Sequence, residues 1–92
     1  MLNLWVMKAT ILYHPNSEWA RSVEEYARDF ERQRGKKIEL ISLEVQEGSA
    51  MASLYDVTRY PAVLATREDG ELLYLWQGEQ LPLMNEVAAY LD

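Results

Sequence analysis

The chain has 92 residues, of which 49% are hydrophobic and 26% are charged, and its formal net charge is -6. This length and composition predict one globular domain over residues 1–92 with a single hydrophobic core. Cysteine is absent, which excludes a disulfide, a thiolate metal site and thiol–disulfide exchange by this chain alone. The single histidine leaves few ligands for a transition metal, so we expect neither a metal nor a cofactor.

Charge is distributed unevenly along the chain. From residue 38 onward the basic residues are Arg59 and Arg67, and carboxylates outnumber them. An acidic surface repels phosphate backbones, so we expect no nucleic-acid binding and favour a basic protein or peptide as the partner. The basic cluster at 32–37 is better explained as favourable charge at the end of a helix than as an anion site.

The apolar run at the start of the chain, residues 1–7, is shorter than the roughly 20 residues that cross a membrane. It has neither a basic leader nor a small-residue cleavage site, so we expect a cytoplasmic protein without a membrane partner. Leu2, Leu4 and Val6 alternate with the residues between them. This alternation predicts that residues 2–7 extend the first strand or add an edge to the sheet.

The first half of the chain predicts a strand, a long helix and a second strand. Residues 9–13 are apolar on both faces, which is typical of a central strand. Apolar residues recur every three or four positions from 18 to 34, which predicts an amphipathic helix ended by Gly35. Asn16 and Ser17 are residue types that favour the N-cap of such a helix. Alternation over 37–45 predicts an edge strand.

The second half predicts a short helix, a hairpin and a last helix. Gly48 and Ser49 are expected to open a helix over 50–55 that turns Met51, Leu54 and Tyr55 toward the sheet. Two apolar runs, which begin after Pro61 and after the turn at 68–71, predict an antiparallel hairpin that ends at Gly78. Pro82 fits the first turn of the last helix. The apolar face of that helix comprises Leu83, Met84, Val87, Ala88 and Leu91.

This order of elements predicts an α/β fold. A right-handed crossover through the first helix makes the first two strands parallel neighbours, and the hairpin adds an antiparallel half. We therefore expect a four-stranded mixed sheet in the order 2-1-3-4, flanked by three helices.

The element order and the Tyr60-Pro61 pair resemble the thioredoxin superfamily from residue 9 to residue 91. The resemblance implies a three-layer sandwich and a cis bond before Pro61. In redox members a Cys-x-x-Cys pair lies between the first strand and the first helix. Here Ser17-Glu18-Trp19-Ala20 holds that place. The resemblance thus implies a domain that keeps the binding half of the site and lacks the reactive half.

We accordingly expect a non-catalytic module, monomeric or homodimeric, that binds a protein or peptide in the groove beside Pro61. Two alternatives remain open. One is a glutathione-binding or glutathione-dependent enzyme that uses Ser17, and the other is a structural domain that self-associates. His14 lies near Ser17, but a strand-end histidine without a catalytic role is the simpler interpretation. Trp19 is either a core residue or an anchor for the partner. The expected groove residues are His14, Asn16, Ser17, Trp19, Tyr60 and Pro61.

Overall fold

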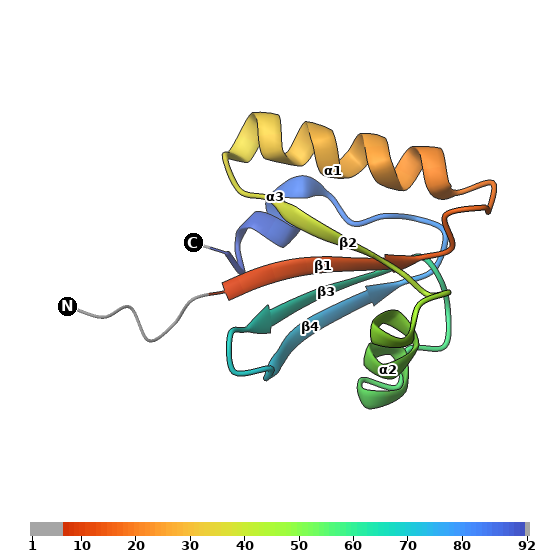
Figure 1. Ribbon diagram of the computed structural model, residues 1–92. Coiled ribbons are helices and arrows are strands. Elements are labelled where there is room, and N and C mark those ends of the chain that lie inside the picture. Colours follow the sequence, from red (N-terminus) through yellow and green to blue (C-terminus); the bar gives the residue numbers. More distant parts are fainter. Residues whose placement is uncertain (1–6, 92) are drawn as a thin grey trace.

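A computed structural model of the chain describes residues 7–91 (Figure 1). The expectation for residues 2–7 lies outside this part of the chain, except at Met7, which begins the first strand. None of the helices in residues 7–91 is long and apolar enough to cross a membrane. The elements in order are β1 (Met7–Tyr13), α1 (Ala20–Arg34), β2 (Ile38–Ser42), α2 (Gln46–Leu54), β3 (Ala62–Arg67), β4 (Leu72–Gln77) and α3 (Met84–Ala88).

The four strands form one mixed sheet in the order β2-β1-β3-β4, which confirms the predicted order. β1 and β2 are parallel, with Ala9 opposite Ile38. β1 pairs with β3 and β3 with β4 in antiparallel fashion. β2 is shorter than the predicted 37–45 because the chain turns after Ser42, whose hydroxyl accepts the backbone N–H of Glu44 at 3.0 Å.

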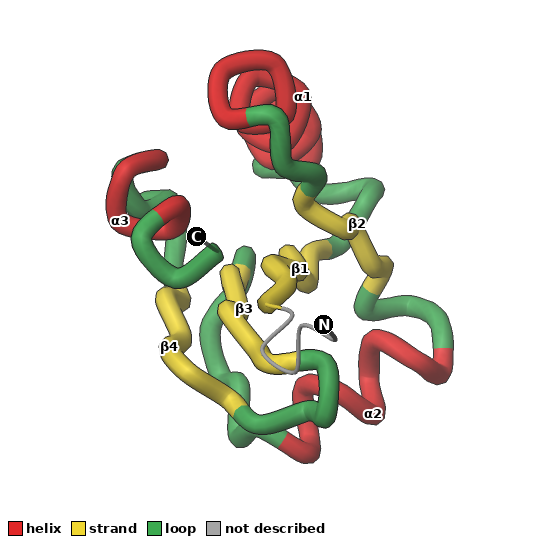
Figure 2. The backbone as a smooth tube through the Cα atoms, turned by 90° about the vertical axis from the view of Figure 1, so that its left-hand side faces the viewer, coloured by secondary structure: helices red, strands yellow, loops and turns green. Residues whose placement is uncertain are grey.

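Helices cover both faces of the sheet, with α1 and α3 on one face and α2 on the other (Figure 2). Each face has its own cluster of buried side chains, because alternate residues of a strand point to opposite faces. On the first face the cluster includes Ile11, Val23, Phe30, Val63 and Val87. On the second face it includes Leu12, Ile41, Ala52, Val57 and Leu64.

Helix α1 buries the apolar stripe that the sequence predicts, and it ends at Gly35 with a left-handed backbone (φ 70°). It begins at Ala20 rather than at residue 18. Its N-cap is Trp19, and no side chain caps it, so the N-cap prediction for Asn16 and Ser17 is wrong. The Ser17 hydroxyl donates instead to the carbonyl of His14, because the chain makes a turn before the helix starts.

Helix α2 begins at Gln46, four residues earlier than predicted, and Gly48 lies inside it. Residue 48 has to be a glycine because the helix approaches the end of β2 closely, and a Cβ on Gly48 would lie 2.0 Å from the carbonyl oxygen of Ser42. Ala52 is the residue of this helix that enters the core, while Met51 and Tyr55 are partly buried. Leu54 is 72% exposed, so the prediction that it faces the sheet is wrong.

Helix α3 is also shorter than predicted. Pro82 precedes it, and Leu83 is its N-cap, 67% exposed rather than part of the apolar face. The Glu86 carboxylate accepts the backbone N–H of Leu83 at 2.9 Å, so the helix starts at Met84, two residues later than it would with Pro82 at the first helical position. The side chains of Val87, Ala88 and Leu91 are buried as expected.

Candidate functional site

Three segments of the chain meet at the end of the sheet where β1 and β4 stop and β3 begins (Figure 1). They enclose a cleft of about 650 Å³. We call the segment 14–19 the first wall and the segments 58–61 and 78–80 together the second wall. The residues lining the cleft are Tyr13, His14, Ser17, Trp19, Thr58, Arg59, Tyr60, Pro61, Gly78, Glu79 and Gln80.

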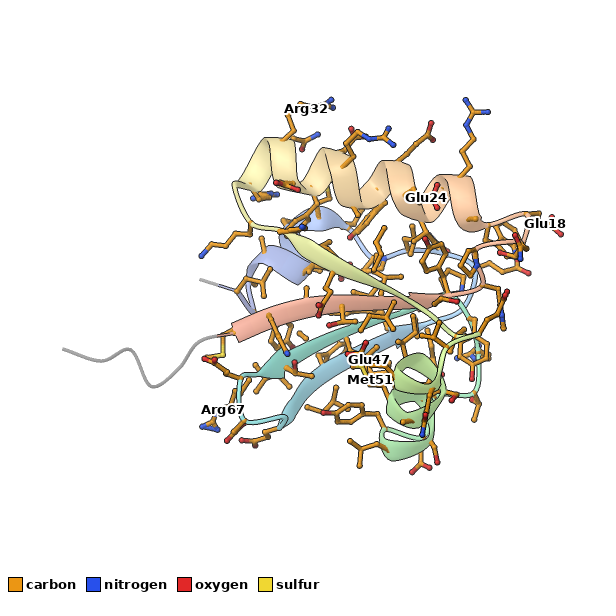
Figure 3. The ribbon with its side chains drawn as sticks, viewed as in Figure 1. Glu18, Glu24, Arg32, Glu47, Met51 and Arg67 are labelled. Carbon is orange, nitrogen blue, oxygen red and sulfur yellow. The ribbon has the colours of Figure 1, made fainter. Side chains whose placement is uncertain are left out.

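The first wall is a turn that bonds to itself. Both the backbone N–H and the hydroxyl of Ser17 donate to the carbonyl of His14, at 3.0 Å and 2.7 Å. Trp19 follows at the start of α1, partly buried, and lines the cleft. Glu18, between these two residues, projects at the tip of the turn, at the opposite end of the molecule from Arg67 (Figure 3).

The second wall is held by the end of β4. The side-chain oxygen of Gln77 accepts two backbone N–H groups, from Thr58 at 3.0 Å and from Arg59 at 3.1 Å. One residue later, the N–H of Gly78 donates to the carbonyl of Pro61 at 3.0 Å. The peptide bond between Tyr60 and Pro61 is cis. The backbone that enters β3 is therefore positioned by residues of the neighbouring strand.

The main chain of Tyr60 is open at this point. Within residues 7–91 neither its N–H nor its C=O has a hydrogen-bond partner, whereas its hydroxyl donates to the carbonyl of Val57 at 3.2 Å. An unpaired backbone donor and acceptor on one residue are the groups that an added strand pairs with. They belong to the residue before Pro61, and both residues line the cleft.

The rings of His14 and Tyr60 meet edge to face, with centroids 5.6 Å apart. Both residues also line a second hollow of about 360 Å³ on the side of α2. Besides these two residues, its lining consists of the apolar Leu43, Ala52 and Val57 and of two serines, Ser49 and Ser53. The ring pair thus separates the cleft from the second hollow, and a ligand that crosses the pair reaches both.

The charged groups of the site are few. Arg59 and Glu79 line the cleft, and no ion pair joins them. At its rim, His14 Nδ1 lies 3.9 Å from Glu44 Oε2. Burial raises the pKa of Tyr13, and the bond from its hydroxyl to Glu24 at 3.0 Å raises it further. The Tyr13 hydroxyl consequently stays protonated, and can donate to Glu24, to higher pH than the hydroxyl of an exposed tyrosine.

Neither a nucleophile–base pair nor a metal site is assembled here. The Ser17 hydroxyl bonds the main-chain carbonyl of His14 and not its imidazole, and nucleophilic catalysis needs the latter contact. Among the residues that the structure describes, no group of three or more histidine, aspartate or glutamate side chains could hold a metal ion. What the arrangement offers is shape, aromatic surface and open backbone groups.

Comparison with solved structures decides the fold. A mutant thioredoxin from Halobacterium salinarum superposes with a TM-score of 0.75 at 20% identity, over 94% of this chain and 75% of that one. Thioredoxin from Fasciola hepatica gives 0.73 at 12% identity, over 95% and 82% of the two chains. This chain has the thioredoxin fold. An uncharacterised thioredoxin-like protein from Clostridium perfringens also matches, with a TM-score of 0.73 at 16% identity over 97% of this chain and 71% of that one. Neither a protein-family model nor a curated protein matches the sequence.

In this thioredoxin fold the structure brings together five of the six residues that the sequence singles out. His14, Ser17, Trp19, Tyr60 and Pro61 all line the cleft, while Asn16 is exposed in the turn and does not line it. Trp19 is neither fully buried nor fully exposed, so it belongs to the cleft and to the start of the helix alike.

Sequence reasoning missed the other lining residues, which are Tyr13, Thr58, Arg59, Gly78, Glu79 and Gln80. A signal for part of this set was present. The predicted hairpin brings the end of its second strand close to Pro61. Counting back from the turn at 68–71 gives Gln77 as the residue opposite Pro61, but a register shift between Ala65 and Thr66 makes it Gly78. The contribution of Arg59 had no sequence signal, because it depends on the bond between its backbone and the Gln77 side chain.

Proposed function

We propose that this chain is a non-catalytic module with the thioredoxin fold that binds an extended segment of a protein partner in the cleft. The observation that carries the proposal is the open main chain of Tyr60, whose N–H and C=O lack partners within residues 7–91. In strand addition, main-chain hydrogen bonds supply affinity and side-chain pockets supply specificity. Tyr60 supplies the main-chain hydrogen bonds, and the cleft and the second hollow supply the side-chain pockets.

The two hollows suit an extended ligand in particular. Successive side chains of a strand point to opposite sides, so a peptide paired with Tyr60 directs neighbouring side chains to the two sides of the His14–Tyr60 ring pair. A larger side chain fits the cleft against Trp19, and a small apolar one fits the hollow beside Ala52. Aromatic anchors of this kind dominate the energetics of many protein interfaces.

The side chains of the first wall support a non-catalytic role. Ser17 and Ala20 hold the places at which redox members of the superfamily, by the resemblance given above, have cysteines. Ala20 is buried at the start of α1, and the Ser17 hydroxyl is bonded to the turn. A side chain engaged in closing its own turn is a structural element, and recognition is the use that remains for the cleft.

The net charge of -6 favours a partner that is basic overall. Binding to such a partner weakens as salt is added, because exposed charges are screened over about 8 Å at physiological ionic strength. The partner is proposed here by its chemistry, as an extended segment of a basic protein.

A glutathione-dependent enzyme is the second candidate, because Ser17 lines the cleft and is accessible. The donation of its hydroxyl hydrogen to His14 weighs against a role in stabilising a thiolate. Self-association is the third candidate. β4 forms an edge of the sheet, carries no charge from Leu72 to Gln77, and exposes Tyr74. Charged residues normally protect such an edge.

A cross-linking experiment tests the first candidate against the third. A photoreactive phenylalanine analogue replaces Trp19 in one variant and Leu54, an exposed residue outside both hollows, in another. We expect a partner from the native host to be cross-linked through position 19 and not through position 54. Products that contain only this chain would favour self-association and reject the peptide-binding proposal.

Affinity capture with substituted chains gives an independent measure. The double variant Trp19→Ala, Tyr60→Ala should lose the captured partner. The matched control Leu54→Ala, Leu83→Ala removes two highly exposed apolar side chains outside the cleft and should retain it. Equal recovery with both double variants would show that another surface binds the partner.

A further inference from the structure

Arg59 is a cationic residue that lines the cleft. Its side chain is exposed, and it forms no ion pair with any carboxylate in residues 7–91. Arg21, Arg32 and Arg67 each pair with an acidic residue three or four positions away. The other arginines without an ion pair in residues 7–91, Arg28 and Arg34, lie on α1 and do not line the cleft. Arg59, which is adjacent to the open main chain of Tyr60, therefore has its charge available for a ligand.

We propose that the cleft selects an extended peptide with one acidic side chain, and that Arg59 binds its carboxylate. This inference rests on the peptide-binding function proposed above and names the chemistry of the peptide. Arginine presents a planar fork of donors that a carboxylate can accept in bidentate fashion. The recognised residue is therefore glutamate or aspartate, at the peptide position next to the one paired with Tyr60.

The backbone geometry fixes where that carboxylate binds. The N–H of Arg59 is held by Gln77 Oε1 at 3.1 Å, so the residue is positioned from β4. Its guanidinium extends toward Gly78, where Nη1 lies 4.0 Å from the point that a Cβ of residue 78 would occupy. A Cβ at residue 78 would therefore be in contact with the guanidinium, and glycine leaves that side of it uncovered. The carboxylate binds the guanidinium in the cleft that Arg59 and Gly78 both line.

The remaining charges limit the peptide to a single acid. Glu79 lines the same cleft, Glu44 lies beside His14 at its rim, and the chain as a whole has a charge of -6. An acidic run would bring further carboxylates against these groups at a cost in affinity. The selected segment is therefore one acidic residue flanked by neutral or basic residues, which agrees with a partner that is basic overall.

A random decapeptide library displayed on phage tests the proposed selection of one acidic residue, and it does so without knowledge of the partner. The baits are the whole chain, its Arg59→Glu variant and a control variant, Arg28→Glu, which makes the same charge change on α1 outside the cleft. We expect the unaltered chain and Arg28→Glu to enrich glutamate or aspartate at one fixed position. Arg59→Glu should enrich lysine or arginine at that position instead.

One selected peptide is then synthesised with its acid and with the corresponding amide. The amide should bind the unaltered chain about fivefold more weakly, the upper end for an exposed ion pair. Both peptides should bind Arg59→Gln equally, because that variant has no charge to distinguish them. This second variant keeps a side chain of similar length, so the comparison does not depend on the folding of the charge-reversed chain.

The outcomes separate this inference from the function on which it rests. The role of Arg59 is overturned, and peptide binding stays in place, if the enriched peptides need Trp19 and Tyr60 but show no preferred acid, or show the same preference with all three baits. The role of Arg59 and the peptide-binding function are both overturned if the enriched peptides bind the Trp19→Ala, Tyr60→Ala variant equally well, or if no peptide is enriched.

Discussion

The two walls of the cleft are built in different ways. Hydrogen bonds of the first wall, residues 14–19, join it to residues 14–23 in the described part of the chain, so the turn is closed locally. The second wall is tied to β4 by Gln77, which is 18 and 19 residues away from the two N–H groups that it accepts. The part of the site that presents backbone is thus fixed by tertiary structure, while the part that holds cysteines in redox members is an ordinary turn.

This difference indicates that the two functions of such a site are separable. A turn that depends on local bonds can exchange its side chains with little effect elsewhere. A wall that depends on a neighbouring strand keeps its shape as long as the sheet does. Substitutions in the first wall should therefore change chemistry, and substitutions in the second wall should change stability and binding.

Restoring thiols in the first wall should create an activity that the chain lacks. We expect Ser17→Cys, Ala20→Cys to reduce insulin disulfides above the uncatalysed rate, while the unaltered chain matches a blank without protein. The reason is that a helix N-terminus lowers the pKa of a thiol beside it, and the second wall is already in place.

The control for this gain is Ser17→Cys alone, which has an attacking thiol and no resolving one. It should form a mixed disulfide and stop there. If the double variant forms its own disulfide and yet shows no turnover, the second wall does not suffice for substrate binding.

Removing the acceptor of the second wall should reduce both stability and binding. Gln77→Ala leaves the N–H groups of Thr58 and Arg59 without their partner. At roughly 0.5–1.5 kcal/mol for each net hydrogen bond, the free energy of unfolding should fall by about 1–3 kcal/mol. Urea denaturation measures the loss. Gln77→Glu retains an acceptor oxygen and should lose less, and equal losses in the two variants would contradict the assigned role.

Gly78→Ala tests the backbone of the second wall. Gly78 has φ of 114°, a conformation that costs an alanine about 1–3 kcal/mol. Its matched control is Gly35→Ala, also at positive φ, with no neighbouring atom within 4 Å and a position at the far end of α1. Both variants should unfold at lower urea concentrations. Only Gly78→Ala should weaken peptide binding, which a calorimetric titration with a library-selected peptide would measure.

The smallest effect is expected from Ser17→Ala. The lost hydrogen bond is local and accessible, so the free energy of unfolding should change by no more than about 1 kcal/mol. Calorimetric titration with glutathione should give the same result before and after the substitution. Submillimolar glutathione binding that disappears in Ser17→Ala would replace our proposal with the glutathione-dependent enzyme.

The sequence was sufficient for the sheet because its patterns are periodic. The apolar run at 9–13, the long stripe of α1 and the Asp69-Gly70 turn each have one satisfactory interpretation, and together they leave one strand order. The resemblance to thioredoxins added the position of the cleft. Five lining residues followed from these two sources.

The errors concern places where tertiary contacts overrule local preference. Ser17 has the residue type of an N-cap, but the turn uses its hydroxyl for His14. Leu54 and Leu83 have the spacing of core residues and yet lie at helix ends with their side chains mostly exposed. The role of Gln77 has no local signature at all, since an amide on a strand is informative only once its distant partners are known.

Gly48 sets a limit on how the second hollow can change. Any side chain there would collide with the backbone of Ser42, so α2 would have to move away from β2. Ser49, Ala52 and Ser53 of the same helix form one side of the hollow beside Tyr60. Residue 48 therefore acts as a spacer that determines the depth of this hollow from outside it. Engineering a wider specificity would begin with the distance between a helix and a strand, before any residue that contacts the ligand is altered.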